Sequence, residues 1–337
     1  VMALAADLTR EEHRIKVMAT IGVTIGVSFA VSMILGPVLN GWIGVSGIFW
    51  LTALLALFGI AVVRFRVPDP VASRIHRDAE PVASQFGRVL NDGQLLRLNF
   101  GIFILHLLLT ATFVAVPLAL RDAGLASDQH WQVYLPALTF SMAIMIPFII
   151  LAEQRQQLKA VFLGAILTLA LVAFGLTTLP DTVLEITALL LVFFTAFNLL
   201  EATLPSLIAK LAPPDAKGTA MGIYSSSQFL GAFAGGAVGG WLNGQFGPHG
   251  VFAFTTLGAL AWLLVAWTMR EPLYLSGYLL NVGILDEVEA RLLMLRLIEV
   301  PGVAEAAVAA DEGVAYLKVD RRTLDEAMLR QFAADTP

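Results

Sequence analysis

Ionisable side chains inside long apolar segments are the first candidates for chemistry in this chain. Glu201 lies in the middle of the apolar stretch 183–208. A charged side chain at the centre of a bilayer costs roughly 2.5–3.5 kcal/mol on insertion scales, so such a residue is a candidate for function. Asn198 precedes Glu201 by three residues and Pro205 follows it by four, which places all three near one side of a helix. The carboxyl group can carry a proton, or it can be a permanent hydrogen-bonded contact to a neighbouring helix; both interpretations are open.

His106 is the second candidate, and it lies about two helical turns after Asn99 in the apolar stretch 98–120. An imidazole titrates at about pH 6.5 when unperturbed, which suits a proton relay or a substrate contact. A single histidine in an apolar helix is also commonly a packing residue. No histidine or carboxylate lies three or four residues from His106, so the spacing predicts no metal site.

Polar and small residues mark two other apolar stretches. The run Tyr224-Ser225-Ser226-Ser227-Gln228 enters the stretch 218–243, and its hydroxyl and amide groups would bind a substrate in a cavity or a neighbouring helix at an interface. In the stretch 17–40, Gly36-Pro37 joins a residue that permits close helix approach to one that opens the helical hydrogen-bond ladder. Spaced glycines predict close helix contact at Gly231, Gly235, Gly236, Gly239 and Gly240.

The composition shows which elements must position these residues. The chain is 58% hydrophobic and 14% charged, whereas soluble domains carry about 25% charged residues. So much apolar surface cannot be hidden in a water-soluble core of 337 residues, so lipid must surround most of it. Segments of about 20 apolar residues, long enough to cross a bilayer, give eight predicted spans: 17–40, 46–66, 98–120, 131–151, 159–179, 183–208, 218–243 and 248–269.

Lys and Arg residues orient these spans, because cytoplasmic loops are enriched in them. Of the 15 Lys and Arg residues up to position 270, 14 fall in one set of alternate loops and only Arg121 falls in the other. Both ends and the loop 67–97 are therefore predicted to be cytoplasmic. Within this loop, 85–98 is mildly amphipathic, with Phe86, Val89 and Leu90 on one side, and we expect it to lie along the inner headgroup layer.

After position 272 the sequence has the character of a small soluble domain. Residues 278–283, EAAVAAD and GVAYLKVD read as strands, while 285–298 and TLDEAMLRQF read as helices. The order βαββα predicts a ferredoxin-like sandwich. A disordered tail is the alternative.

Two stretches about 200 residues apart repeat one another. The first runs from Lys16 through Gly41-Trp42 to Gly47-Ile48-Phe49, and the second from Lys217 through Gly240-Trp241 to Gly250-Val251-Phe252. A parallel repeat of this size in a membrane chain is typical of transporters built from two six-helix halves. Because the chain opens inside the pattern, we expect it to be N-terminally truncated and to lack about four helices of the first half.

The chain resembles the major facilitator superfamily, and within it the bacterial YajR-type branch, which carries a C-terminal ferredoxin-like domain called YAM. The matching strings are ADLTREEHR at 6–14, MILGPVLNGW at 33–42, NFGIFILHLLL at 99–109, NLLEATLPSLIAK at 198–210 and KGTAMGIYSSSQFLGAF at 217–233. The resemblance implies an all-α major facilitator fold with eight of twelve helices present, followed by a small α+β domain. It also implies a bacterial inner-membrane location.

The same resemblance implies residues that gate the conformational change. LAEQRQQLK at 151–159 is similar to the family's cytoplasmic signature loop, with Glu153 as its acid and Arg155 and Lys159 as its bases. Asp7, near Arg10, occupies the position of an acid that pairs with the first-half loop. Gly36-Pro37 resembles the motif of drug:proton antiporters, although Asn40 stands where that motif carries glycine.

These observations predict a secondary active transporter that exports small organic or drug-like compounds against an inward proton flux by alternating access. Its proton-coupling or substrate-binding residues are predicted to be Glu201, His106, Asn198, Gln228, Tyr224 and Asn99. The alternative is a membrane-embedded ligand sensor that signals through its C-terminal domain, by a regulatory contact or by self-association. No nucleophile–base pair, metal cluster, phosphate loop, cofactor motif or dense basic cluster for nucleic acid occurs.

The predicted division of the chain has four parts. They are the end of the N-terminal half at 1–66, a cytoplasmic linker at 67–97, the C-terminal six-helix half at 98–270, and the soluble domain at 278–337.

Overall fold

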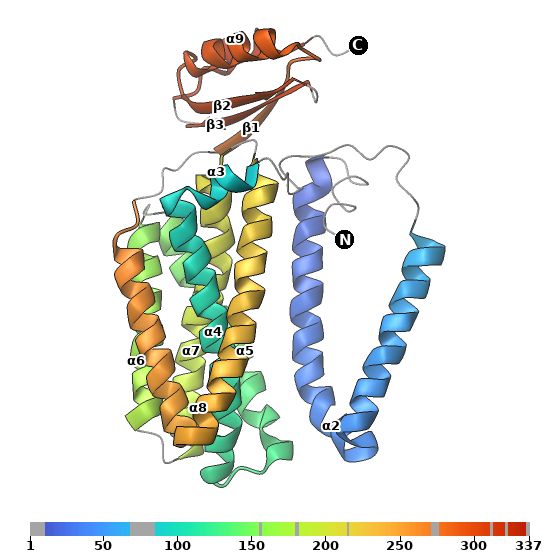
Figure 1. Cartoon of the computed structure of the whole chain (residues 1–337), viewed down its shortest axis with the longest axis vertical. Helices are drawn as coiled ribbons and strands as arrows, with labels where there is room; N and C mark the ends of the chain where they lie inside the picture. The colour runs from blue at the N-terminus through green and yellow to red at the C-terminus, as the bar shows by residue number, and fades with distance from the viewer. Residues whose placement is uncertain are drawn as a thin grey trace.

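The computed structural model describes residues 11–67, 85–154, 157–178, 182–213, 216–270, 276–310, 313–320 and 323–334. Figure 1 shows a set of long, roughly aligned helices with a small sheet and helix at one end. The long helices are α2 (Glu11–Arg66), α4 (Gly93–Asp122), α5 (Trp131–Gln154), α6 (Leu158–Thr178), α7 (Val183–Leu211) and α8 (Lys217–Trp267). All six are long and apolar enough to cross a membrane.

Two of these helices are pairs joined at a glycine. Non-helical backbone occurs inside α2 at Gly44 (φ 68°, ψ 175°) and inside α8 at Gly247 (φ 67°, ψ −169°). Each of the two therefore contains two helical arms, as the predicted span pairs 17–40 with 46–66 and 218–243 with 248–269 require.

The two breaks also correct the predicted register of the internal repeat. Gly44 matches Gly247 and Gly47 matches Gly250, an offset of 203 residues. At this offset the sequence LNGWIGVSGIF at 39–49 aligns with LNGQFGPHGVF at 242–252. The predicted pairing of Gly47-Ile48-Phe49 with Gly250-Val251-Phe252 has this offset. The predicted pairing of Gly41-Trp42 with Gly240-Trp241 is displaced from it by one helical turn, because the turn-forming glycines, and not the Gly-Trp dipeptide, fix the register.

Local capping explains where some helices begin. Asp92 Oδ1 accepts hydrogen bonds from the backbone N–H groups of Gln94 and Leu95, so α4 begins at Gly93 and not at 98. The segment 85–98 is thus two elements, the short α3 (Phe86–Leu90) and the start of α4. Val89 is fully buried while Phe86 and Leu90 are exposed, so these three side chains do not form one lipid-facing side.

The bundle is centred on α4, which packs along α8. Leu98, Ile102, Leu105 and Leu108 of α4 are almost completely buried. A Cβ atom added at Gly231, Gly235 or Gly239 would collide with or press on the α4 backbone near Phe103, Leu107 and Ala111. The predicted glycine contact is confirmed at these three positions, since α8 can approach α4 closely only where it has no side chain. Gly236 and Gly240 instead have open space at the Cβ position.

The α2 pair lies beside this bundle (Figure 1). It contacts α5 and the 3₁₀ helix η2 (Ser127–Gln129). Large apolar side chains along its second arm are exposed, among them Phe49, Trp50 and Phe58. In a bilayer these side chains contact lipid or other helices.

The C-terminal domain contains β1 (Ser276–Asn281), α9 (Glu287–Ile298), β2 (Val303–Ala309), β3 (Val314–Val319) and α10 (Glu326–Arg330). The predicted βαββα order is confirmed. The sheet has the order β1-β3-β2, and β3 is antiparallel to both neighbours. Because β1 and β2 are then parallel with β3 between them, this is a split βαβ arrangement.

Candidate functional site: a polar cluster between α4, α7 and α8

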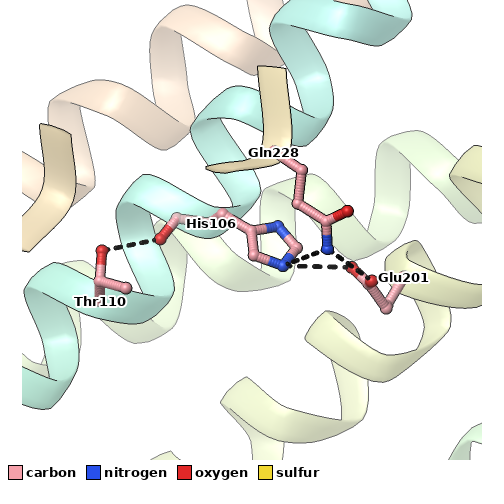
Figure 2. Close-up of polar contacts among 4 residues, drawn as sticks. All are labelled: His106, Thr110, Glu201 and Gln228. Carbon is pink, nitrogen blue, oxygen red and sulfur yellow. Dashed lines mark hydrogen bonds and ion pairs between the residues drawn. The ribbon is translucent and has the colours of Figure 1, made fainter. Parts of the chain in front are cut away.

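Three of the predicted site residues meet inside the bundle, one from each of three helices (Figure 2). Gln228 Nε2 on α8 lies 2.8 Å from His106 Nε2 on α4 and 3.3 Å from Glu201 Oε1 on α7. His106 Nε2 and Glu201 Oε2 are 3.9 Å apart. The amide of Gln228 therefore contacts both ionisable groups.

Packing explains why these side chains converge. The glycine contact between α4 and α8 brings the two backbones together, and Thr110 strengthens it by donating a hydrogen bond to the carbonyl oxygen of Ala232, 2.9 Å away. From α7, the ring of Phe197 packs edge-on against His106 with 5.8 Å between ring centroids. The imidazole is thereby held between a glutamine and an aromatic ring.

The cluster is only partly open. The side chain of His106 is 13% exposed and that of Glu201 is 38% exposed, although Glu201 Oε2 itself is buried. Among the described residues, Glu201 Oε2 has no hydrogen-bond partner. One carboxylate oxygen thus stays available for a proton, a water molecule or a substrate group.

The other predicted binding residues lie around this cluster without joining it. Asn198 donates from Nδ2 to Ser141 Oγ of α5, at 2.9 Å. Asn99 and Tyr224 are about 95% buried, and the side-chain polar atoms of both lack hydrogen-bond partners within the part of the chain that the structure describes. A buried polar group without a partner is costly, which makes both residues candidates for contact with water or a ligand.

The predicted gating residues are mostly beyond what the structure describes. Asp7, Arg10 and Arg155 lie outside the described residues, as do the side chains of Pro37 and Glu153. Lys159 is partly exposed near the start of α6. Gly36 lies within α2 and has open space at its Cβ position.

Two polar residues were not predicted. Ser141 bonds Asn198 across α5 and α7, and Thr110 links α4 to α8. Both are polar residues within predicted spans, which was a usable signal. Neither carries a charge, however, and hydroxyl groups in helices commonly bond to their own backbone.

An apolar cleft of about 570 Å³ lies between α5, α6 and α7. Its lining includes Phe148, Gly164, Thr195 and Leu199. Glu201, His106 and Gln228 do not line it, so the cleft is separate from the polar cluster.

Apolar helices that enclose a buried polar cluster define the class, a multi-pass membrane protein with polar groups gathered inside its bundle. The family model described as Major Facilitator Superfamily matches residues 1–236 and residues 100–278. The chain therefore belongs to the major facilitator superfamily of transporters, which is not an enzyme family.

Similar proteins place it within that family. The chain is 42% identical to the inner membrane transport protein YajR of Escherichia coli (strain K12), over 98% of this chain and 73% of that protein. It is 31% identical to the transporter BU466 of Buchnera aphidicola, over 81% of this chain and 70% of the relative. It is 24% identical to the multidrug resistance protein MdtH of Klebsiella pneumoniae (strain 342), over 71% of this chain and 60% of that protein. These matches support a multi-pass inner-membrane transporter of the YajR branch.

Proposed function

We propose that this transporter exports small organic or drug-like compounds in exchange for protons, and that Glu201 carries the proton. The observation that carries the proposal is the meeting of a carboxyl, an imidazole and an amide group between α4, α7 and α8. Such groups are costly inside a membrane bundle, so their convergence favours a role in coupling over a role in packing. The name of the MdtH relative, a multidrug resistance protein, supports drug-like substrates.

The surrounding residues fit the same function. We assign Asn99, Tyr224 and Asn198 to the wall of the substrate pathway, because the first two have buried, unpartnered polar atoms and the third bridges to α5. In alternating access the two halves rock around such a central site. Gly36, Pro37, Glu153, Arg155, Lys159, Asp7 and Arg10 remain proposed gating positions.

The orientation and division of the chain are part of the proposal. The bias of Lys and Arg toward one set of loops supports cytoplasmic chain ends. The four-part division at 1–66, 67–97, 98–270 and 278–337 follows from that orientation. Its last part corresponds to the described domain that begins at Ser276.

Substrate-driven proton flux in liposomes tests the role of Glu201. Compounds that raise the midpoint of thermal unfolding would first be selected from a panel, because a ligand stabilises the state that it binds. Glu201→Gln keeps the shape of the side chain but cannot ionise, so we expect proton flux to fall to the level of empty liposomes while thermal stability is retained.

The matched control is Asp122→Asn, which neutralises an exposed carboxylate at the end of α4. This variant should transport like the unaltered protein. Full proton-coupled transport by Glu201→Gln would refute the proposal and leave Glu201 as a structural contact between helices.

We further propose that the C-terminal domain regulates transport through a contact with α7. Lys318 of β3 is 4% exposed, forms an ion pair with Glu305 at 3.1 Å, and donates to the carbonyl oxygen of Leu211 at 3.4 Å. Leu211 is the last residue of α7, the helix that carries Glu201. A cation at a helix C-terminus stabilises that end, so the domain can report on or restrain α7.

Lys318→Met tests this contact because it keeps an apolar stem and removes the charge. A contact worth about 1 kcal/mol corresponds to roughly a fivefold shift in a two-state equilibrium, and we expect the transport rate to change by a similar factor. Lys318→Arg, which keeps the charge, is the control. An unchanged rate in Lys318→Met would refute regulation through this contact. Unchanged rate and oligomeric state after deletion of 278–337 would leave the domain a role in stability only, and a change in oligomeric state would favour self-association.

A further inference from the structure

We infer that Gln228 links the protonation of Glu201 to the tautomer of His106 by rotation of its side-chain amide. The inference rests on the proposed function, because it concerns how the same site handles a proton. Figure 2 shows the arrangement that carries it, with the amide nitrogen placed against both neighbours.

The short contact between two nitrogens determines which group donates. An amide nitrogen can only donate, so at 2.8 Å from Gln228 Nε2 the His106 Nε2 atom must accept. His106 is then neutral and carries its proton on Nδ1. The same amide nitrogen donates to Glu201 Oε1 at 3.3 Å, which suits an ionised carboxylate.

Rotation of the amide reverses both requirements. With its oxygen in place of its nitrogen, Gln228 can only accept. His106 must then present a proton on Nε2, and Glu201 must be protonated to donate from its carboxyl group. One orientation of Gln228 therefore fits an ionised Glu201 with the Nδ1–H tautomer, and the other fits a protonated Glu201 with the Nε2–H tautomer.

Mixed arrangements are unfavourable. With the wrong tautomer, or with the amide rotated toward an ionised Glu201, two N–H groups or two oxygens without a shared proton lie at contacts of 2.8 and 3.3 Å. With the amide unrotated and Glu201 protonated, Oε1 can still accept from Gln228, but the proton lies on the buried Oε2, which has no hydrogen-bond partner among the described residues. A buried polar group left without a hydrogen-bond partner is costly. The two changes are thus expected to occur together.

The coupled change takes up one proton in total. Glu201 gains a proton from water, while His106 loses a proton from Nδ1 to water and gains one from water at Nε2. His106 stays neutral throughout, so only Glu201 changes charge. The 38% exposed side chain of Glu201 gives water a route to the cluster.

Among the described residues, no other charged side chain forms an ion pair with Glu201 or His106. From α8, Tyr224 interacts electrostatically with Glu201, and its hydroxyl is buried. From α5, residues 131–152 contain no charged side chain. From α6, which also packs on α7, the only charged residue is Lys159 near its start.

Two spectroscopic probes test the inference on protein in liposomes. Nitrogen-15 resonances of labelled histidine distinguish the Nδ1–H, Nε2–H and imidazolium forms, and the signal lost in His106→Asn identifies His106 among the five histidines. The infrared band of a protonated carboxyl group that is lost in Glu201→Gln identifies Glu201. In the unaltered protein, the change of tautomer and the appearance of this band should share one pH midpoint.

Gln228→Met should separate the two events, because methionine fills the space but can neither donate nor accept strongly. The Glu201 band should still titrate, while the His106 tautomer should no longer follow it. Gln132→Met, the same change at an exposed position of α5, is the control and should keep the shared midpoint.

Three results would overturn the inference. They are a single tautomer at all pH values in the unaltered protein, an imidazolium signal at the Glu201 midpoint, or a retained link in Gln228→Met. The first two are measured on the unaltered protein, and the variants serve only to assign its signals. Normal proton flux in Glu201→Gln would defeat the proposed function instead, whereas loss of flux together with unlinked spectra would defeat only the role of Gln228.

Discussion

The helix pairs α2 and α8 share one turn but differ in what covers them. Both break at a glycine with nearly the same backbone angles, Gly44 and Gly247. At the register that this turn sets, Ser28, Ser32 and Gly36 of α2 correspond to Gly231, Gly235 and Gly239 of α8. These small residues of α8 lie against α4, while Ser28 and Ser32 are exposed and Gly36 faces open space.

The turn is therefore set by local backbone conformation, whereas the packing depends on a neighbouring helix. The same turn forms in both pairs, whether or not the small-residue face before it is covered. Close packing needs a second helix, and among the residues that the structure describes α4 supplies it to α8 but no helix supplies it to Ser28, Ser32 and Gly36. At the same register, Gln228 and Tyr224 correspond to Ile25 and Ile21. The repeat therefore preserves the architecture, while these two polar candidates have apolar counterparts in the first copy.

The largest loss of stability is expected for a substitution on the side of α8 that packs against α4. Gly235→Leu should destabilise the protein because even a Cβ atom at this position collides with Leu107 and Thr110 of α4. Overpacking costs roughly 1–3 kcal/mol or more, and we expect the upper end of that range, since the obstacle is backbone. The midpoint of thermal unfolding in detergent, measured by intrinsic fluorescence, should fall by roughly 5 °C or more.

Ser32→Leu is the matched variant at the corresponding position of α2. It should leave the unfolding midpoint nearly unchanged, because Ser32 is exposed and, within the described part of the chain, its hydroxyl donates to the carbonyl oxygen of Ser28 in its own helix. Equal destabilisation by both variants would contradict the difference between α2 and α8, since it would mean that the small-residue face of α2 is also covered in the working protein.

Hydropathy was sufficient to predict the spans, because a membrane imposes a minimum length of apolar sequence on each one. The sequence predicted the repeat register correctly after the turn, at 47–49 and 250–252, but not before it, since the residues that fix it are two turn glycines whose role appears only in their backbone angles. The start of α4 could have been predicted from Asp92, a favoured helix-capping residue three positions before Leu95.

The sequence predicted the individual residues of the candidate site, but not that they meet. Glu201, His106 and Gln228 were each selected as polar groups in apolar segments, but spacing within one helix does not tell which helix faces it. Asn198 shows the limit: it shares a side of α7 with Glu201 by spacing, yet it bonds to α5, while Glu201 contacts α4 and α8. Their meeting depends on the close approach at Gly231 and Gly235, which is a property of two helices together.

The smallest expected effect concerns the shared turn itself, through Gly44→Ala and Gly247→Ala. Both glycines have positive φ with ψ near 180°, a region that only glycine occupies readily, and neither has an atom within 4 Å of its Cβ position. The cost is therefore backbone strain alone, roughly 1–3 kcal/mol. Because the angles agree, both variants should lower the unfolding midpoint by similar amounts, less than Gly235→Leu does.

Gly41→Ala and Gly244→Ala are matched controls one turn earlier. Both positions are helical with open space at Cβ, so alanine should be neutral or stabilising by up to about 1 kcal/mol. If Gly247→Ala proved far more damaging than Gly44→Ala, the turn of α8 would depend on its packing in the bundle. The turn would then not be a local property, even though the two pairs share its backbone angles, and turn and packing could not be separated.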